Sequence, residues 1–165
     1  MTDRYTDNIT VLETNIDDST GEMLGYVSEK LFSAGARDVF YTSIYMKKNR
    51  PAYKLTVICS DDLKEAMEDI IFEETTAIGI RSRNETRSCL SREIREADTA
   101  FGLIKVKCVS TKKGLKMYPE YDSAREAAKK YNVPLYEVYA EINRVSRSEN
   151  NCGKKERYSL FQALK

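Results

Sequence analysis

The sequence contains no histidine in its 165 residues. Histidine is the commonest protein ligand of transition metals and the base of the Ser-His-Asp triad and the Cys-His pair. Its absence excludes those catalytic arrangements. A transition metal would need atypical ligands here, or ligands from another polypeptide or from the substrate. A hard cation held by carboxylates and phosphate oxygens is still compatible with the composition.

The chain also has little net charge, since Lys+Arg number 27 and Asp+Glu number 26, which gives +1. This balance excludes a broad basic field for duplex nucleic acid or an anionic membrane. Residues 124–142 superficially resemble a helix-turn-helix, but they carry Glu126, Glu137 and Glu141 and offer no base-reading surface. We expect no DNA, RNA or membrane partner, so any charge-based recognition must be local.

Cysteines are few and apolar runs are short. Cys59, Cys89, Cys108 and Cys152 show neither CxxC spacing nor the density of a disulfide framework, and three of them fall in predicted strands. We therefore expect reduced thiols that serve as small core residues. The N-terminal residues lack the hydrophobic segment of a signal peptide, which predicts a cytoplasmic protein.

Residues 9–90 predict the order strand, helix, strand, strand, helix, strand. The first strand, 9–17, is β-branched and alternating, and Ser19 with Glu22 forms a capping-box pattern at the start of a helix. Apolar residues then recur at helical spacing until Gly35, which ends that helix. This order is that of the ferredoxin-like βαββαβ fold, of the α+β class, with strands in the spatial order fourth, first, third, second. The remaining predicted elements are strands 38–46 and 53–59, a helix capped by Ser60 to Asp62, and a strand from Ile80.

Beyond residue 90 the pattern changes. Residues 91–97 and 103–109 alternate and predict a further β-hairpin, and two helices follow, one capped by Asp122 or Ser123 and one over Leu135 to Ile142. We therefore expect three parts: a ferredoxin-like domain over 9–90, a β-hairpin plus helical C-terminal subdomain over 91–145, and a polar tail over 146–165 in which Tyr158 to Leu164 add one helical turn.

Three polar stretches interrupt the first domain: Glu13 to Asp18, Lys47 to Pro51, and Glu73 to Arg81. The predicted topology brings the end of the first strand, the hairpin between the second and third strands, and the end of the second helix to one edge of the sheet. An acidic stretch, a basic hairpin and a Thr/Gly turn then share one cleft. This is the chemistry that holds a polyphosphate and its hard cation, so we expect the functional site here.

Asp17 and Asp18 are the expected metal ligands of this cleft. An acidic residue at this position can also simply cap the following helix and interact with its dipole. Two adjacent aspartates exceed what capping requires, so one is free to hold a divalent cation or its waters.

The expected phosphate clamp consists of Lys47, Lys48, Asn49 and Arg50. Arg50 offers a planar guanidinium that can donate two hydrogen bonds, each lysine offers a point charge, and Asn49 favours the turn. The alternative is a solvated hairpin whose charges only protect the sheet edge.

Thr75, Thr76 and Arg81 complete the predicted cofactor-binding set. Threonines are poor choices for a helix interior, and here their hydroxyls and the backbone around Gly79 would approach the ligand while Arg81 pairs with an anion. The alternative is a frayed helix end. The sequence does not identify the catalytic residues.

Four motifs in this order resemble the C-terminal half of the LarC family, which inserts nickel into pyridinium bisthiocarboxylate mononucleotide to complete the nickel-pincer cofactor of lactate racemase. The likeness covers about residues 9 to 142. The motifs are Leu12-Glu-Thr-Asn-Ile-Asp-Asp-Ser-Thr-Gly-Glu-Met-Leu-Gly25, Ile44-Tyr-Met-Lys-Lys-Asn-Arg-Pro51, Ile71-Phe-Glu-Glu-Thr-Thr-Ala-Ile-Gly-Ile-Arg81 and Tyr118-Pro-Glu-Tyr121.

The resemblance implies a CTP-dependent nickel chelatase of the lyase class, in which this portion binds the nucleotide triphosphate with Mg²⁺ or Mn²⁺ and assembles into homo-oligomers. Full-length members of the family carry an additional N-terminal domain. This chain is therefore expected to be incomplete without such a domain, whether it belongs to the same protein or to a separate chain. The residues leave a second hypothesis open, a non-catalytic effector-binding or oligomerisation module of ferredoxin-like fold.

Overall fold

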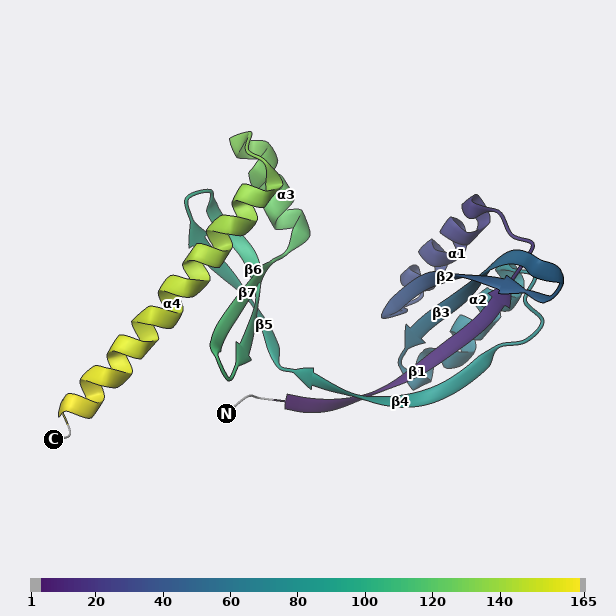
Figure 1. Ribbon diagram of the computed structural model, residues 1–165, viewed down its shortest axis with the longest axis horizontal. Coiled ribbons are helices and arrows are strands. Elements are labelled where there is room, and N and C mark those ends of the chain that lie inside the picture. Colours follow the sequence, from purple (N-terminus) through teal and green to yellow (C-terminus); the bar gives the residue numbers. More distant parts are fainter. Residues whose placement is uncertain (1–3, 164–165) are drawn as a thin grey trace. The chain divides into compact units, whose positions relative to one another are not determined.

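A computed structural model describes the backbone of residues 4–163 and the side chains of residues 4–150 (Figure 1). The chain divides into two compact units, one over Thr6–Ser88 and one formed mainly by the chain from Cys89 onward. No helix in the described part is long and apolar enough to cross a membrane.

The first unit contains a four-stranded sheet in the order β2-β3-β1-β4, which is the predicted order. Strand β3 pairs antiparallel with both β1 and β2. The ferredoxin-like assignment itself stays a prediction. The elements are β1 (Arg4–Ile16), α1 (Gly21–Ser33), β2 (Asp38–Met46), the 3-10 turn η1 (Lys47–Asn49), β3 (Arg50–Cys59), the 3-10 turn η2 (Asp61–Leu63), α2 (Lys64–Glu74) and β4 (Arg81–Leu90).

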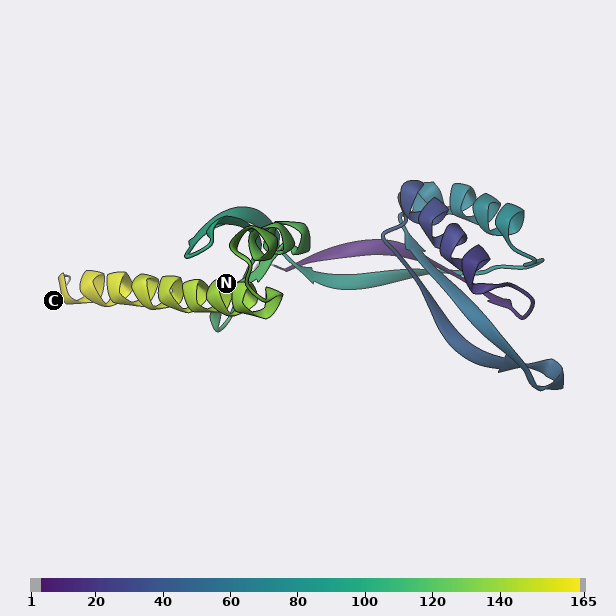
Figure 2. The same ribbon diagram turned by 90° about the horizontal axis from the view of Figure 1, so that it is seen from above.

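The core of this unit lies between the sheet and its two helices. Leu12 of β1 and Val57 of β3 are register partners and are both fully buried. They pack in one cluster with Leu31 of α1 and Met67 of α2, so both helices cover the same face of the sheet (Figure 2). Burying one such side chain stabilises the fold by about 1.5–3 kcal/mol. Because side chains alternate along a strand, the odd-numbered residues of β1 face away from the helices.

The start of α1 corrects the prediction that Ser19 caps the helix. The N-cap is Thr20, whose side-chain oxygen accepts a hydrogen bond from the Met23 amide at 3.3 Å. The Ser19 hydroxyl is buried and has no described partner. Ser and Thr are both strong N-caps, so the sequence pattern alone does not separate neighbouring candidates. Gly35 ends the helix as predicted, with φ of 100°.

Two other predicted caps are also wrong. Ser60 makes no side-chain cap bond and precedes η2, so α2 begins only at Lys64. The N-cap of α3 (Tyr121–Tyr131) is Glu120, not Asp122 or Ser123. The Ser123 hydroxyl instead accepts a hydrogen bond from the Lys105 amide at 3.0 Å, which ties α3 to the neighbouring sheet.

The second unit contains a three-stranded sheet in the order β5-β6-β7, where the sequence predicted only a hairpin. The additional strand follows a tight turn at Lys112 and Lys113, and Gly114 after it takes φ of 123°, which favours glycine. Ile104 and Val106 of the middle strand pack with Val138 and Ile142 in a separate core. The elements are β5 (Arg92–Thr99), β6 (Gly102–Thr111), β7 (Gly114–Pro119), α3 and α4 (Leu135–Ala163).

Helix α4 extends through residues that the sequence suggested to be a polar tail. The predicted turn over Tyr158 to Leu164 therefore lies in this helix as far as Ala163, and Leu164 lies outside the described residues. Cys59 and Cys108 are free and buried, and Cys89 is free and half-buried. The side chain of Cys152 lies outside the described part of the chain.

Candidate functional site

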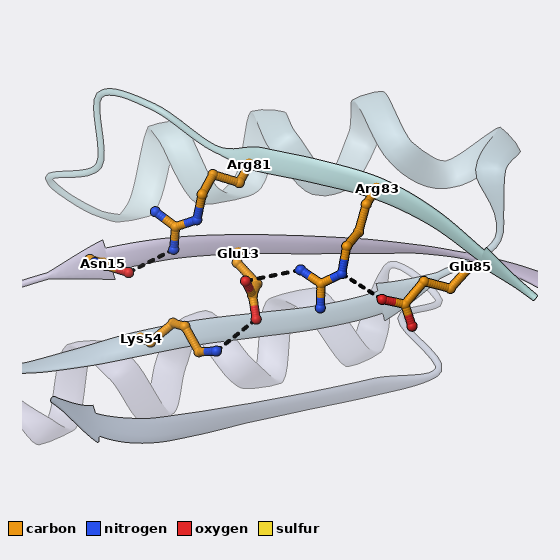
Figure 3. Close-up of polar contacts among 6 residues, drawn as sticks. All are labelled: Glu13, Asn15, Lys54, Arg81, Arg83 and Glu85. Atoms are coloured by element: carbon orange, nitrogen blue, oxygen red, sulfur yellow. Dashed lines mark hydrogen bonds and ion pairs between the residues drawn. The ribbon is translucent and has the colours of Figure 1, made fainter.

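The three polar stretches are joined by side-chain hydrogen bonds at one end of the four-stranded sheet. Arg50 of the hairpin donates to the Asp17 carboxylate at 3.0 Å. The Thr76 hydroxyl donates to the Asp18 carboxylate. Arg81 donates to the Asn15 side-chain oxygen at 2.8 Å (Figure 3). We call this group the charged corner, and it consists of Asn15, Asp17, Asp18, Arg50, Thr76 and Arg81.

The charged corner follows from where the elements end. Strand β1 stops at Ile16, so the next two residues lie in the connection to α1. Strand β3 begins at Arg50 and pairs with β1 as far as Tyr53 opposite Ile16. Strand β4 begins at Arg81 and lies beside β1 on its other side. The end of β1 is therefore flanked by cations from both neighbouring strands.

A row of charges continues from this corner along the helix-free face of the sheet (Figure 3). Glu13 of β1 accepts hydrogen bonds from Lys54 of β3 at 2.7 Å and from Arg83 of β4 at 3.0 Å. Arg83 also donates to Glu85. The Glu13 side chain is only 13% exposed, and its bonds to Lys54 and then to Arg83 lower the pKa of its carboxyl to about 2. Glu13 is thus a fixed negative charge between two strands at neutral pH.

The hairpin residues Lys47, Lys48 and Asn49 form η1 and are exposed. Lys48 and Asn49 have φ of 61° and 56°, in the left-handed region that non-glycine residues adopt at a cost of about 1 kcal/mol or more. Neither lysine makes an ion pair with any residue of the described chain. Both ammonium groups are therefore available to an anion.

The structure does not bring Thr75 into the charged corner. Its hydroxyl donates to the Ile71 carbonyl at 2.7 Å and accepts from the Ala77 amide at 3.1 Å, which closes the C-terminal end of α2. The following loop is held by the Thr14 hydroxyl, which donates to the Gly79 carbonyl at 2.8 Å. A Cβ at Gly79 would meet nothing within 4 Å, so the protein itself does not require glycine at that position.

Sequence reasoning did not assign Lys54, Thr14 or Arg83 to the site. Lys54 is the register partner of Asn15, so it shares the helix-free face with that polar residue. The signal that identifies Lys54 is that it is the one charged residue in the 52–59 part of β3. The pairing with Glu13 depends on register, which the hydrophobic pattern of β3 does not fix by itself.

The charged corner holds too few protein ligands to bind a metal ion alone. Asp17 is 20% exposed and paired with Arg50, whereas Asp18 is exposed. Within residues 4–150, no group of three or more Asp, Glu or Cys side chains is placed to hold a metal ion. A divalent cation at Asp17 or Asp18 would need further oxygen ligands, which the phosphates of a bound nucleotide supply.

Residues 1–139 match the family described as "Nickel insertion protein". The chain belongs to this family. Among curated relatives, it is 46% identical over 134 residues to the pyridinium-3,5-bisthiocarboxylic acid mononucleotide nickel insertion protein of Alkaliphilus metalliredigens, a match that covers 81% of this chain and 32% of that protein. It is 44% identical over 153 residues to the protein of the same name from Acetivibrio thermocellus, covering 90% of this chain and 38% of that protein.

This member of the nickel insertion family thus spans about a third of the length of the curated relatives it matches. Its fold also resembles a solved structure, described as apo LarC2, the C-terminal domain of a cyclometallase involved in the synthesis of the NPN cofactor of lactate racemase. That similarity has a TM-score of 0.81 and 38% sequence identity, and it covers 87% of this chain and 99% of the LarC2 chain.

Proposed function

We propose that this chain is the CTP- and divalent-cation-binding part of a nickel insertase that completes the nickel-pincer nucleotide cofactor of lactate racemase. Family membership and the names of the relatives support the metal-insertion part. The observation that carries the nucleotide part is the charged corner, where Asp17, Arg50 and Arg81 from three separate stretches lie together.

The pairing within the corner suggests how a metal–nucleotide complex binds. Arg50 and Asp17 neutralise each other without ligand. A triphosphate with its cation is itself an ion pair, so it can replace this contact without leaving a charge unmatched: Arg50 turns to a phosphate and Asp17 to the cation. Lys47, Lys48 and Arg81 add further contacts to the phosphates, and Asp18 adds oxygen ligands for Mg²⁺ or Mn²⁺ or its waters.

Metal-free CTP is expected to bind less well than its metal complex. Its phosphates would lie beside Asp17 and Asp18 with no cation between them. The negative charges of the phosphates and the carboxylates would then repel each other. Cation dependence is therefore part of the proposal.

Nickel is the inserted metal in this proposal, and the pyridinium bisthiocarboxylate mononucleotide is its acceptor. Sulfur ligands suit late transition metals, so the substrate can hold nickel although this chain contains no histidine. An N-terminal domain, of the same protein or a separate chain, would complete the lyase-class activity. The cytoplasmic location and the homo-oligomeric assembly expected from the sequence belong to the same proposal.

Thermal melting tests the nucleotide part. The chain is melted with each of the four nucleoside triphosphates, with and without Mn²⁺. We expect CTP with Mn²⁺ to raise the melting temperature most, since a ligand at 100 times its dissociation constant adds about 2.7 kcal/mol.

Two variants test whether CTP binds at the charged corner. The rise in melting temperature with CTP and Mn²⁺ should be smaller in Arg81→Ala and unchanged in Lys64→Gln, which removes a cation of α2 outside the corner. If no triphosphate shifts the melting temperature under either condition, the proposal fails. A shift without any CTP hydrolysis when the remaining domain is supplied would favour the effector-binding alternative.

A further inference from the structure

A groove of about 400 Å³ lies in the second unit, apart from every residue of the charged corner. Its walls come from β7 and from α4, which packs alongside that strand (Figure 1). A volume of this size is in the range of small-ligand sites. The groove is lined by Thr111, Lys113, Gly114, Leu115, Lys116, Met117, Tyr118, Asn143, Ser146, Arg147 and Asn150.

The charges around this groove are of one sign. Lys113, Lys116 and Arg147 line it, and no carboxylate is among its described lining residues. None of the three cations forms an ion pair within residues 4–150. This contrasts with the helix-free face of the first unit, where Arg83 and Lys54 are both paired with Glu13. Unpaired cations around a concave surface attract an oxyanion.

The floor of the groove is fixed by hydrogen bonds. The Asn150 side chain accepts from the Leu115 amide at 2.7 Å and donates to the Leu115 carbonyl at 2.6 Å, so it occupies the free edge of β7. A Cβ at Gly114 would lie 2.4 Å from Asn150 Oδ1, so this close approach requires glycine. Ser146 is buried and donates to the same Leu115 carbonyl at 3.3 Å.

The edge of β7 also offers a backbone donor. The bonds from Asn150 show that the backbone polar groups of Leu115 point away from β6. Such outward groups recur at every second residue of an edge strand, so the amide of Met117 points to the same side. Helix α4 presents one polar stripe to this edge, because four of the lining residues recur at helical intervals: Asn143, Ser146, Arg147 and Asn150.

We infer that this groove binds the phosphoryl group of a small phosphorylated ligand with a planar ring, that is, a mononucleotide. Lys113, Lys116 and Arg147 hold the phosphate oxygens, and the Met117 amide donates to one of them. Tyr118, which is 50% exposed, offers its ring for stacking. A nucleoside triphosphate and free phosphate carry the same oxyanion chemistry, so both serve as competing probes in the experiment below. The inference does not depend on the proposed role of the charged corner.

Calorimetric titration of the full chain tests this inference, with nicotinic acid mononucleotide, inorganic phosphate and CTP with Mn²⁺ as separate probes. The groove variant is Lys113→Gln/Arg147→Gln. Its matched control is Lys112→Gln/Lys129→Gln, which removes the same number of cations from exposed positions of the same unit that do not line the groove. Melting curves verify that both variants are folded.

We expect the mononucleotide to lose at least tenfold in affinity in the groove variant and nothing in the control. Tyr118→Leu should weaken the binding of the mononucleotide and leave the affinity for inorganic phosphate unchanged. Phosphate that binds as tightly as the mononucleotide, with the same loss in the groove variant, would support the anion groove and identify free phosphate as its ligand.

Equal affinities in the wild type and the groove variant for all three probes, or no binding of any probe, would overturn the inference. Arg50→Ala distinguishes the two sites, because that variant leaves the groove intact. If Arg50→Ala loses CTP binding and the groove variant keeps it, the result tests only the proposed function of the charged corner.

Discussion

Glu13 lies between Lys54 and Arg83 on the helix-free face, and its place there makes the stability of the protein depend on pH. The pKa of its carboxyl falls from an ordinary 4.5 to about 2 in the folded chain. A carboxyl with a depressed pKa contributes stability that is fully present above pH ~4.5 and is lost as the pH falls toward 2. Both cations are partly exposed, so we expect a contribution of about 1–2 kcal/mol at neutral pH.

Glu13→Gln should therefore lower the free energy of unfolding by about 1–2 kcal/mol at pH 7, and the difference from wild type should shrink between pH 4.5 and 2.5. Urea denaturation at a series of pH values measures this. Glu85→Gln is the matched control, because Glu85 bonds to the same Arg83 but is 46% exposed, and it should change stability by about 0.5 kcal/mol or less. A pH-independent difference would contradict the account.

Lys48 is a charged residue whose own backbone lies in the left-handed region, with φ of 61°. Glycine adopts that conformation without strain, so Lys48→Gly should raise the free energy of unfolding by up to about 1 kcal/mol while weakening CTP binding. Lys47→Gly should instead lower stability, because Lys47 lacks a positive φ. Denaturation and CTP titration of both variants measure the two effects, and a Lys48→Gly variant with unchanged CTP affinity would remove Lys48 from the clamp.

At the scale of elements, the start of α1 shows what a capping pattern can and cannot specify. Thr20 accepts the hydrogen bond from Met23, whereas the neighbouring Ser19 has no described partner. Thr20→Ala should lower the free energy of unfolding by about 1 kcal/mol, and Ser19→Ala should change it little or raise it. Thermal or urea denaturation of the two variants checks this, and the reverse order of effects would restore Ser19 as the cap.

Elements with a strong periodic pattern were predictable from the sequence, and those that depend on tertiary contacts were not. The alternation of Leu12 with its neighbours and the helical spacing before Gly35 specify strand, helix and helix end locally. Strand β7 is short, and its pairing depends on the turn before Gly114. The location of the charged corner followed from strand order, whereas the contact of Glu13 with Lys54 required the register of β1 and β3.

At the scale of the whole molecule, we propose that this chain assembles into homo-oligomers. The helix-free face of the first sheet carries the charge row, and Ile78, in the loop before β4, is fully exposed. We expect light scattering at micromolar concentration to give a mass that is a multiple of 18.9 kDa. A single species of 18.9 kDa would contradict this expectation.

The central claim is that the charged corner binds CTP through its metal complex, and calorimetric titration of CTP with and without Mn²⁺ tests it most directly. Arg50→Ala should weaken binding of the metal complex by about 1.5–3 kcal/mol, because it removes a charge-assisted contact. Asp18→Asn should weaken only the contribution of Mn²⁺ and leave the metal-free affinity equal or higher, since one negative charge near the phosphates is removed. Equal affinities in the wild type and both variants, with and without Mn²⁺, would contradict the claim.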